Sequence, residues 1–170
     1  MFNFAAEKKR LRMRYLNIVH AIEDEVLYVD NLKNAENLHQ IRPLYNTIVH
    51  CRSGHILVEV GGSQQVRVAS GHLLLIPAGK FVEPMLLSID ANASALLVSD
   101  RMLKSVLGNQ ISIWNKAMYM KEIYVVEGGG WLIGLQQYTR SVFKEEDAPF
   151  LSHEIMMSFL RTMLLMVCEE

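Results

Sequence analysis

The side chains best suited to metal binding or nucleophilic chemistry are the histidines and cysteines, and their spacing favours neither. The six histidines are His20, His39, His50, His55, His72 and His153. None belongs to a His-x-His pair, whereas a metal site needs several ligands that converge on one point. Cys51 lies between His50 and Arg52, but neighbours on a strand point to opposite faces, so they do not activate its thiol. We therefore expect neither a metal centre nor a reactive thiolate.

Other catalytic patterns are missing from the sequence. It holds no G-x-S-x-G elbow and no Walker loop, and the triple glycine at 128–130 lacks the context of a phosphate cradle. The three acids Glu23, Asp24 and Glu25 are consecutive, so on a strand they do not converge as a catalytic pair. We expect a protein that is not an enzyme.

Four basic side chains could anchor an anionic ligand, namely Arg42, His50, Arg52 and Lys80. The first three lie on or beside early predicted strands, and Lys80 follows a Pro-Ala-Gly turn. An apolar pocket with one or two such groups at its mouth suits an apolar carboxylic acid. The alternative is that each is solvated or paired structurally, because the strand register decides which way a side chain points.

Composition places the chain among single-domain globular proteins. It has 170 residues, of which 51% are hydrophobic, and 17 basic residues against 18 acidic ones. A chain of this length buries roughly 70% of its unfolded surface, and its near-zero net charge gives no overall attraction to nucleic acid. Two cysteines without C-x-x-C spacing favour a reducing compartment, and no apolar run is long enough to cross a bilayer. We expect a cytoplasmic protein with no membrane contact.

The first 15 residues form a basic segment that carries five lysines and arginines against one glutamate. It lacks the apolar region and cleavage site of a secretory signal. We expect an N-terminal arm, either solvated or in contact with phosphate or a partner.

Short, interrupted apolar runs between residues 16 and 99 predict strands. The clearest hairpin joins 55–60 to 65–69 across a Gly-Gly-Ser-Gln turn, in which glycine adopts positive φ without steric cost. Alternation at 65–69 predicts one wet face and one buried face. The unbroken apolar run Leu73–Ile76 predicts a strand buried on both faces and ended by Pro77. Many short strands predict an antiparallel barrel or sandwich.

Beyond residue 99 the apolar spacing becomes helical. A short helix is predicted between a cap at Ser99 or Asp100 and a stop at Gly108. Two longer apolar stripes, within 131–143 and 155–167, predict a C-terminal helix pair joined by an acidic turn. The last stripe could cover the barrel or join two copies of the chain. Its candidate dimerisation residues are Ile155, Phe159, Leu160, Met163 and Leu164.

The segment Gly71-His72-Leu73-Leu74-Leu75-Ile76-Pro77-Ala78-Gly79 resembles the second motif of the cupin superfamily. The histidine that binds metal in that motif is replaced here by Val82, and the His-x-His pair of the first motif is also missing. The resemblance implies a cupin-like barrel over residues 16–99 that works without metal or another cofactor.

With Ser53-Gly54 before the hairpin and helices after the barrel, the same motif resembles the N-terminal regulatory domain of AraC/XylS-family transcription activators. The strand-to-helix junction at 97–107 is similar to that of the virulence-regulator branch, where fatty acids are ligands in some members and partner proteins in others. The resemblance covers roughly residues 40 to 168. It implies a mainly β fold, a cupin-like antiparallel barrel followed by a C-terminal helix pair.

The functional implication is an effector-sensing, homodimeric domain, with residues 100–170 as a helical dimerisation and linker region. DNA would be bound only by a C-terminal helix-turn-helix domain, which these residues do not contain. The sequence stops without a helix stop signal, so we expect a longer parent chain. Two alternatives remain, a metal-free cupin that binds a small molecule or acts as an isomerase, and an adaptor whose helices bind a partner protein.

Overall fold

Two antiparallel sheets and a layer of helices make up the fold. The computed structural model describes residues 19–22, 24–34, 44–60, 63–80, 82–119, 124–127, 137 and 153–169. The strands are β1 (Val19–Ile22), β2 (Val26–Val29), β3 (Asn46–Ser53), β4 (His55–Val60), β5 (Gln64–Ala69), β6 (Leu73–Ile76), β7 (Val82–Leu87), β8 (Asn92–Val98) and β9 (Tyr124–Val126). The helices are α3 (Asp100–Leu107), α4 (Ile111–Tyr119) and α6 (His153–Glu169), with 3-10 turns η1 (Leu32–Asn34) and η3 (Gly108–Gln110).

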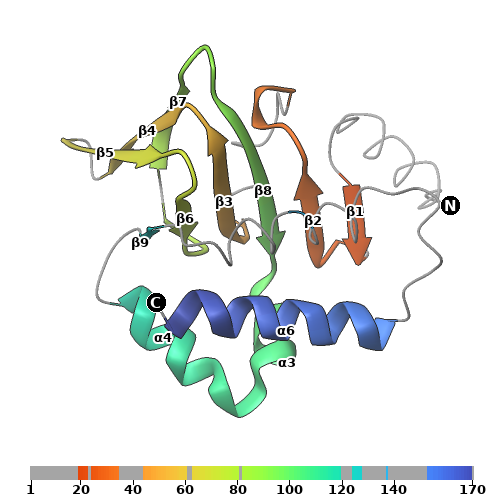
Figure 1. The fold of residues 1–170 in the computed structure, drawn as a ribbon. Helices are drawn as coiled ribbons and strands as arrows, with labels where there is room; N and C mark the ends of the chain where they lie inside the picture. The colour runs from red at the N-terminus through yellow and green to blue at the C-terminus, as the bar shows by residue number, and fades with distance from the viewer. Residues whose placement is uncertain are drawn as a thin grey trace, which may run out of the picture.

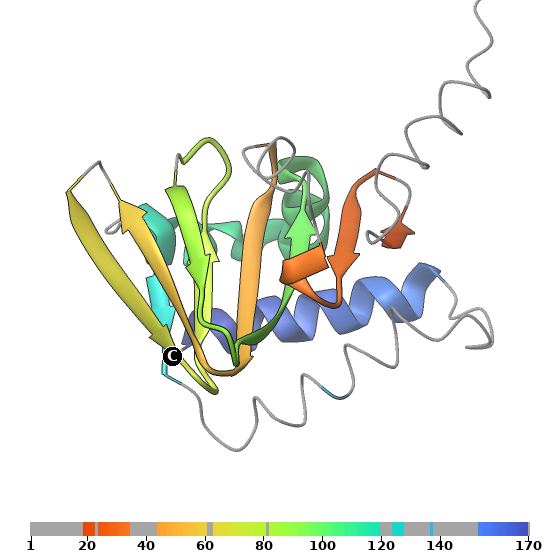
Figure 2. The same cartoon turned by 90° about the horizontal axis from the view of Figure 1, so that it is seen from above.

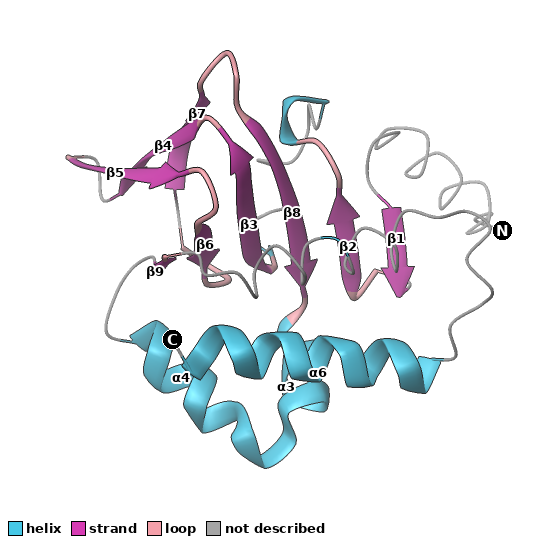
Figure 3. Ribbon diagram, viewed as in Figure 1, coloured by secondary structure: helices cyan, strands magenta, loops and turns pink. Residues whose placement is uncertain are grey.

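Within the described residues, the larger sheet has the order β1-β2-β8-β3-β6-β9 and the smaller sheet has the order β5-β4-β7. All paired neighbours are antiparallel. The helices lie below the strands in Figure 1, and Figure 3 shows the same division by type of structure. The predicted antiparallel, cupin-like fold is confirmed, in the form of two facing sheets that the described strands do not close into a barrel.

The larger sheet is buried on both faces because its strands alternate between two apolar clusters. One cluster combines Val49, Cys51 and Leu97 with Ile56 and Val58 of the smaller sheet, so it fills the space between the sheets. The other cluster joins the opposite face of the larger sheet to α3, α4 and α6. Figures 1 and 2 show α6 running across the strands of the larger sheet.

Several local predictions are confirmed. Strands β4 and β5 pair in register from His55 with Ala69 to Val60 with Gln64, and all four residues of β6 are buried. Helix α3 begins where expected, because the Ser99 hydroxyl accepts a hydrogen bond from the Met102 N–H at 3.0 Å.

Two elements were not predicted. Helix α4 contributes the buried Trp114 to the helix-side cluster, and β9 pairs with β6 to extend the larger sheet. The region 100–170, predicted as helical, therefore also supplies a strand. The helix predicted within 131–143 lies outside the described residues, apart from residue 137. No helix in the described part of the chain is long and apolar enough to cross a membrane.

Candidate functional site

Arg52 lies on the helix-facing side of the larger sheet, and its guanidinium is held by protein acceptors. Its Nε donates to Asn92 Oδ1 at 3.0 Å, and Nη1 lies 3.2 Å from Asp30 Oδ1. Nη2 donates to the Asp30 carbonyl oxygen. Because the Arg52 and Asp30 side chains are only 12% and 23% exposed, this ion pair is partly desolvated and ties the end of β2 to β3 and β8. Arg52 therefore has a structural partner where the sequence suggested a ligand anchor.

Tyr28 continues the same polar cluster, which we define as Tyr28, Asp30, His50, Arg52, Asn92 and Ser94. The Tyr28 hydroxyl donates to Asp30 Oδ1 at 3.1 Å. Burial, and then the negative charge of Asp30, raises the pKa of Tyr28 to about 12. Tyr28 therefore stays protonated and donates to the carboxylate that also holds Arg52. Neither Tyr28 nor Asp30 was singled out from the sequence, since their convergence depends on which strands become neighbours.

His50 projects to the same face as Arg52, and its cross-strand neighbours are Leu73 and Ser94. Burial, and then the positive charge of Arg52, lowers the pKa of His50 from 6.5 to about 4. The imidazole is therefore neutral near pH 7 and offers no positive charge to an anionic ligand.

The pKa of His50 predicts an acid-dependent loss of stability. Between about pH 6.5 and 4 the unfolded chain binds a proton that the folded chain does not, so stability falls as the pH drops through this window. We expect His50→Gln to reduce the loss between pH 7 and 5 by about 1 kcal/mol, a value lowered for the partial exposure of the ring. Urea unfolding at both pH values measures this difference, and parallel losses in the two chains would contradict it.

Lys80 lies far from Arg52. It is exposed, and it ends the turn that carries the chain from β6 in the larger sheet to β7 in the smaller one. The turn is held by Asn46, whose Oδ1 accepts from the Ala78 N–H at 3.1 Å. Asn46 and Arg52 are at opposite ends of β3, roughly 20 Å apart at strand spacing. The structure thus brings His50 and Arg52 together and separates them from Lys80, while Arg42 lies outside the described residues.

The interior between the sheets is filled by aliphatic side chains and Cys51. The Cys51 thiol donates to the Ser53 carbonyl oxygen at 3.4 Å. Burial, and then the charge of Asp90, raises the pKa of this thiol. Cys51 is buried and forms no disulfide. In the described part of the chain, no group of three or more His, Cys, Asp or Glu side chains could hold a metal ion.

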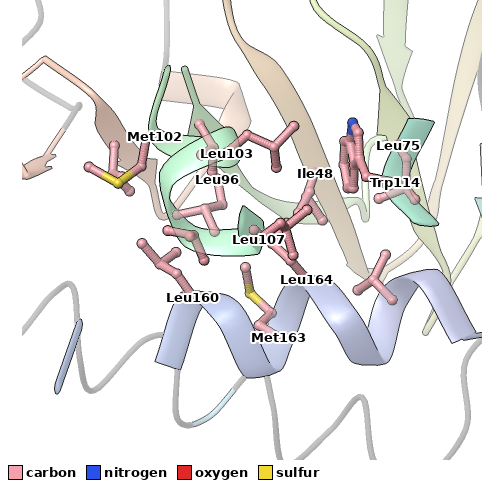
Figure 4. Packing of buried hydrophobic residues seen from close by; sticks show 14 of the residues in the cluster. Ile48, Leu75, Leu96, Met102, Leu103, Leu107, Trp114, Leu160, Met163 and Leu164 are labelled. Atoms are coloured by element: carbon pink, nitrogen blue, oxygen red, sulfur yellow. The ribbon is translucent and has the colours of Figure 1, made fainter. Parts of the chain in front are cut away.

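The apolar stripe of α6 packs into its own chain. Leu160, Met163 and Leu164 are buried against α3 and the larger sheet, and Phe159 is half-buried against the same cluster. Figure 4 shows Met163 and Leu164 pointing toward Leu107 and Ile48. The Ile155 side chain lies outside the described residues. In this arrangement, three of the five candidate dimerisation residues have core positions and leave almost no surface for a second copy.

Sequence comparison alone gives no relatives, because no family model and no curated protein matches this chain. The fold does have counterparts among solved structures, and two of them are CuxR and ToxT. CuxR, an AraC-like transcriptional activator, matches with a TM-score of 0.50 at 16% identity, over 85% of this chain and 46% of CuxR.

ToxT from Vibrio cholerae is the second similar protein. An apo structure matches with a TM-score of 0.51 at 10% identity, over 74% of this chain and 48% of that one. ToxT bound to (E)-4-(8-methylnaphthalen-1-yl)but-3-enoic acid matches with a TM-score of 0.50 at 17% identity, over 74% and 49%. The chain thus spans about half the length of these structures, and at such identities the likeness is one of fold.

Proposed function

We propose that this chain is the effector-sensing domain of an AraC/XylS-type transcription regulator of the virulence-regulator kind, with DNA bound by a part of the protein outside these residues. The observation that carries the proposal is the fold match to the activator CuxR over 85% of the chain. The Gly71–Gly79 motif supports it independently, because its Pro-Ala-Gly turn carries the chain from β6 in the larger sheet to β7 in the smaller sheet. A regulatory role also agrees with the lack of a catalytic constellation in the sequence.

The proposed effector is an apolar carboxylic acid, with a fatty acid as the natural example. ToxT has been solved with a small acid of this chemistry, and the side chains that lie between the sheets here are apolar. We assign the contact with the carboxylate to Lys80, an exposed lysine at the turn that joins the two sheets. Arg52 and His50 are less suitable, because the first is only 12% exposed and the second is neutral.

Titration with (E)-4-(8-methylnaphthalen-1-yl)but-3-enoic acid, followed by native mass spectrometry and calorimetry, tests this proposal. We expect one molecule to bind per chain. Lys80→Met should weaken binding about tenfold, which corresponds to the loss of one charge-assisted hydrogen bond. Lys104→Met, at an exposed lysine of α3, is the matched control and should leave the Kd unchanged. No binding by the wild type would refute the effector proposal, and equal Kd values for all three chains would refute the role of Lys80.

We also infer that the chain forms a homodimer through the outer side of α6. Since Leu160, Met163 and Leu164 pack inward, the contact would use side chains such as Met166 of α6 and Ile113 of α4, which are each 37% exposed. An effector that favours one arrangement of sheets and helices would then change how two DNA-binding domains are presented.

A further inference from the structure

The side chain of Asn46 connects three segments that are far apart in the sequence. Asn46 begins β3 and is 3% exposed. Its Nδ2 donates to Asp100 Oδ1 at 2.7 Å and to the Val98 carbonyl oxygen at 3.4 Å. Its Oδ1 accepts from the Ala78 N–H at 3.1 Å. One buried amide therefore joins the turn between the sheets to the first residue of α3.

The two sides of this amide depend on each other. A buried polar group without a partner is costly, so an amide that loses Asp100 is expected to rotate or shift in search of another acceptor. Either movement changes the position of Oδ1, which is the acceptor for Ala78. Conversely, displacing Ala78 leaves Oδ1 without its donor and disturbs the contact with Asp100.

The first turn of α3 is also tied to the sheet from a second side. Glu25, in the turn between β1 and β2, accepts hydrogen bonds from the Ser99 hydroxyl and from Arg101, and its carbonyl oxygen accepts from the Ser99 N–H at 2.9 Å. Further along α3, Leu103 and Leu107 pack in the same cluster as α6. A change at the first turn of α3 therefore reaches the helix layer, while Glu25 keeps the helix attached to the sheet.

We propose that Asn46 couples the turn at residues 77–80 to the helix layer, so that a ligand bound at Lys80 changes the order of the first turn of α3. The use of this coupling for regulation rests on the proposed effector function. The physical coupling between Ala78 and Asp100 does not depend on the effector function, because it can be measured without ligand.

Residue-resolved amide hydrogen exchange by NMR tests the coupling in the ligand-free protein. Asp100→Ala removes the acceptor on α3, and we expect the Ala78 amide to exchange at least about fivefold faster. Lys104→Met, at an exposed residue further along α3, is the control, because it leaves both the first turn of the helix and the contact between Asn46 and Asp100 in place. It should leave the exchange of the Ala78 amide unchanged. An unchanged Ala78 amide in Asp100→Ala, or an equal rise in both variants, would overturn the proposal.

A donor and acceptor exchange tests the contact itself. Asn46→Asp alone brings two carboxylates together, so exchange should rise across the first turn of α3. Adding Asp100→Asn restores a hydrogen bond with the roles reversed, and we expect exchange there to return to within about twofold of the wild type. Failure of the double variant to recover, in a chain with wild-type circular dichroism, would count against a direct role of Asn46.

The link to regulation is measured with (E)-4-(8-methylnaphthalen-1-yl)but-3-enoic acid. In the wild type, the acid should change amide exchange across Asp100–Leu103, and in Asp100→Ala this response should be at least about threefold smaller. An equal response in both chains would refute the coupling. If the acid does not bind at all, the effector function is refuted. The exchange of the Ala78 amide in the ligand-free protein still tests the physical coupling.

Discussion

Replacing Leu160 with alanine is expected to lower the free energy of unfolding by about 3 kcal/mol. The Leu160 side chain is fully buried against α3, where neighbouring side chains such as Leu103 and Leu107 belong to the same cluster. Truncation leaves a cavity between α6 and α3 that the surrounding helices fill only in part. Urea unfolding followed by circular dichroism measures the loss. A change at Leu160 should therefore act on folding rather than on association.

Met166 is the matched control on the same helix, because about a third of its side chain is exposed. We expect Met166→Ala to change the free energy of unfolding by less than about 0.5 kcal/mol. Met166→Glu should keep the fold and reduce the mass in light scattering from that of a dimer to that of a monomer. Equal stability losses for Leu160→Ala and Met166→Ala would contradict the assignment of the two sides of α6. A wild type that is already monomeric would refute the proposed homodimer.

Replacing Gly54 with alanine is expected to destabilise the fold by about 3 kcal/mol or to prevent folding. Gly54 is the single residue between β3 of the larger sheet and β4 of the smaller one, and its φ is +69°. A β-carbon at this position would lie 2.6 Å from the Ala91 Cα and 2.5 Å from the Ser88 Oγ. The backbone at Ala91 cannot rotate away as a flexible side chain could, so the corner between the sheets must open.

Gly79→Ala separates this steric effect from backbone strain. Gly79 also has a positive φ, +78°, but a β-carbon there would meet nothing within 4 Å. We expect a loss of about 1–2 kcal/mol, the cost of the left-handed conformation alone. Thermal unfolding of the two variants gives the comparison. If Gly54→Ala were no more destabilising than Gly79→Ala, the close packing at the corner would not control stability.

Patterns within a few residues of one another were enough to predict much of the fold. The run Leu73–Ile76 is apolar at every position, and it is a strand buried on both faces. Ser99 and Gly108 bound α3 as expected, because capping depends on backbone groups within one helical turn. Helix α4 was missed because its nine residues are too few to form a long apolar stripe, and β9 was missed because a strand of three residues carries little periodic signal.

The candidate site was less predictable, since it depends on strand pairing. Arg52 and His50 share a face of the larger sheet, because they are two residues apart on a strand. That this face turns toward the helices, with Asp30 beside Arg52, follows from the order of β2, β8 and β3 in the sheet. Asn46 showed no signal beyond a polar residue at the start of an apolar strand, and its role appears only when Ala78 and Asp100 converge on it.

The sequence by itself therefore determined many of the strands, helix α3, the turn at Pro77–Gly79 and the lack of a metal-binding motif, because these features depend on spacing along the chain. The tertiary structure decided which charged groups are paired and which end of β3 lies beside the turn that carries Lys80. It also decided that the apolar stripe of α6 covers its own sheet. The physical reason is that an apolar stripe predicts only that some surface buries it. Which surface buries it depends on the packing of segments brought together from the whole chain.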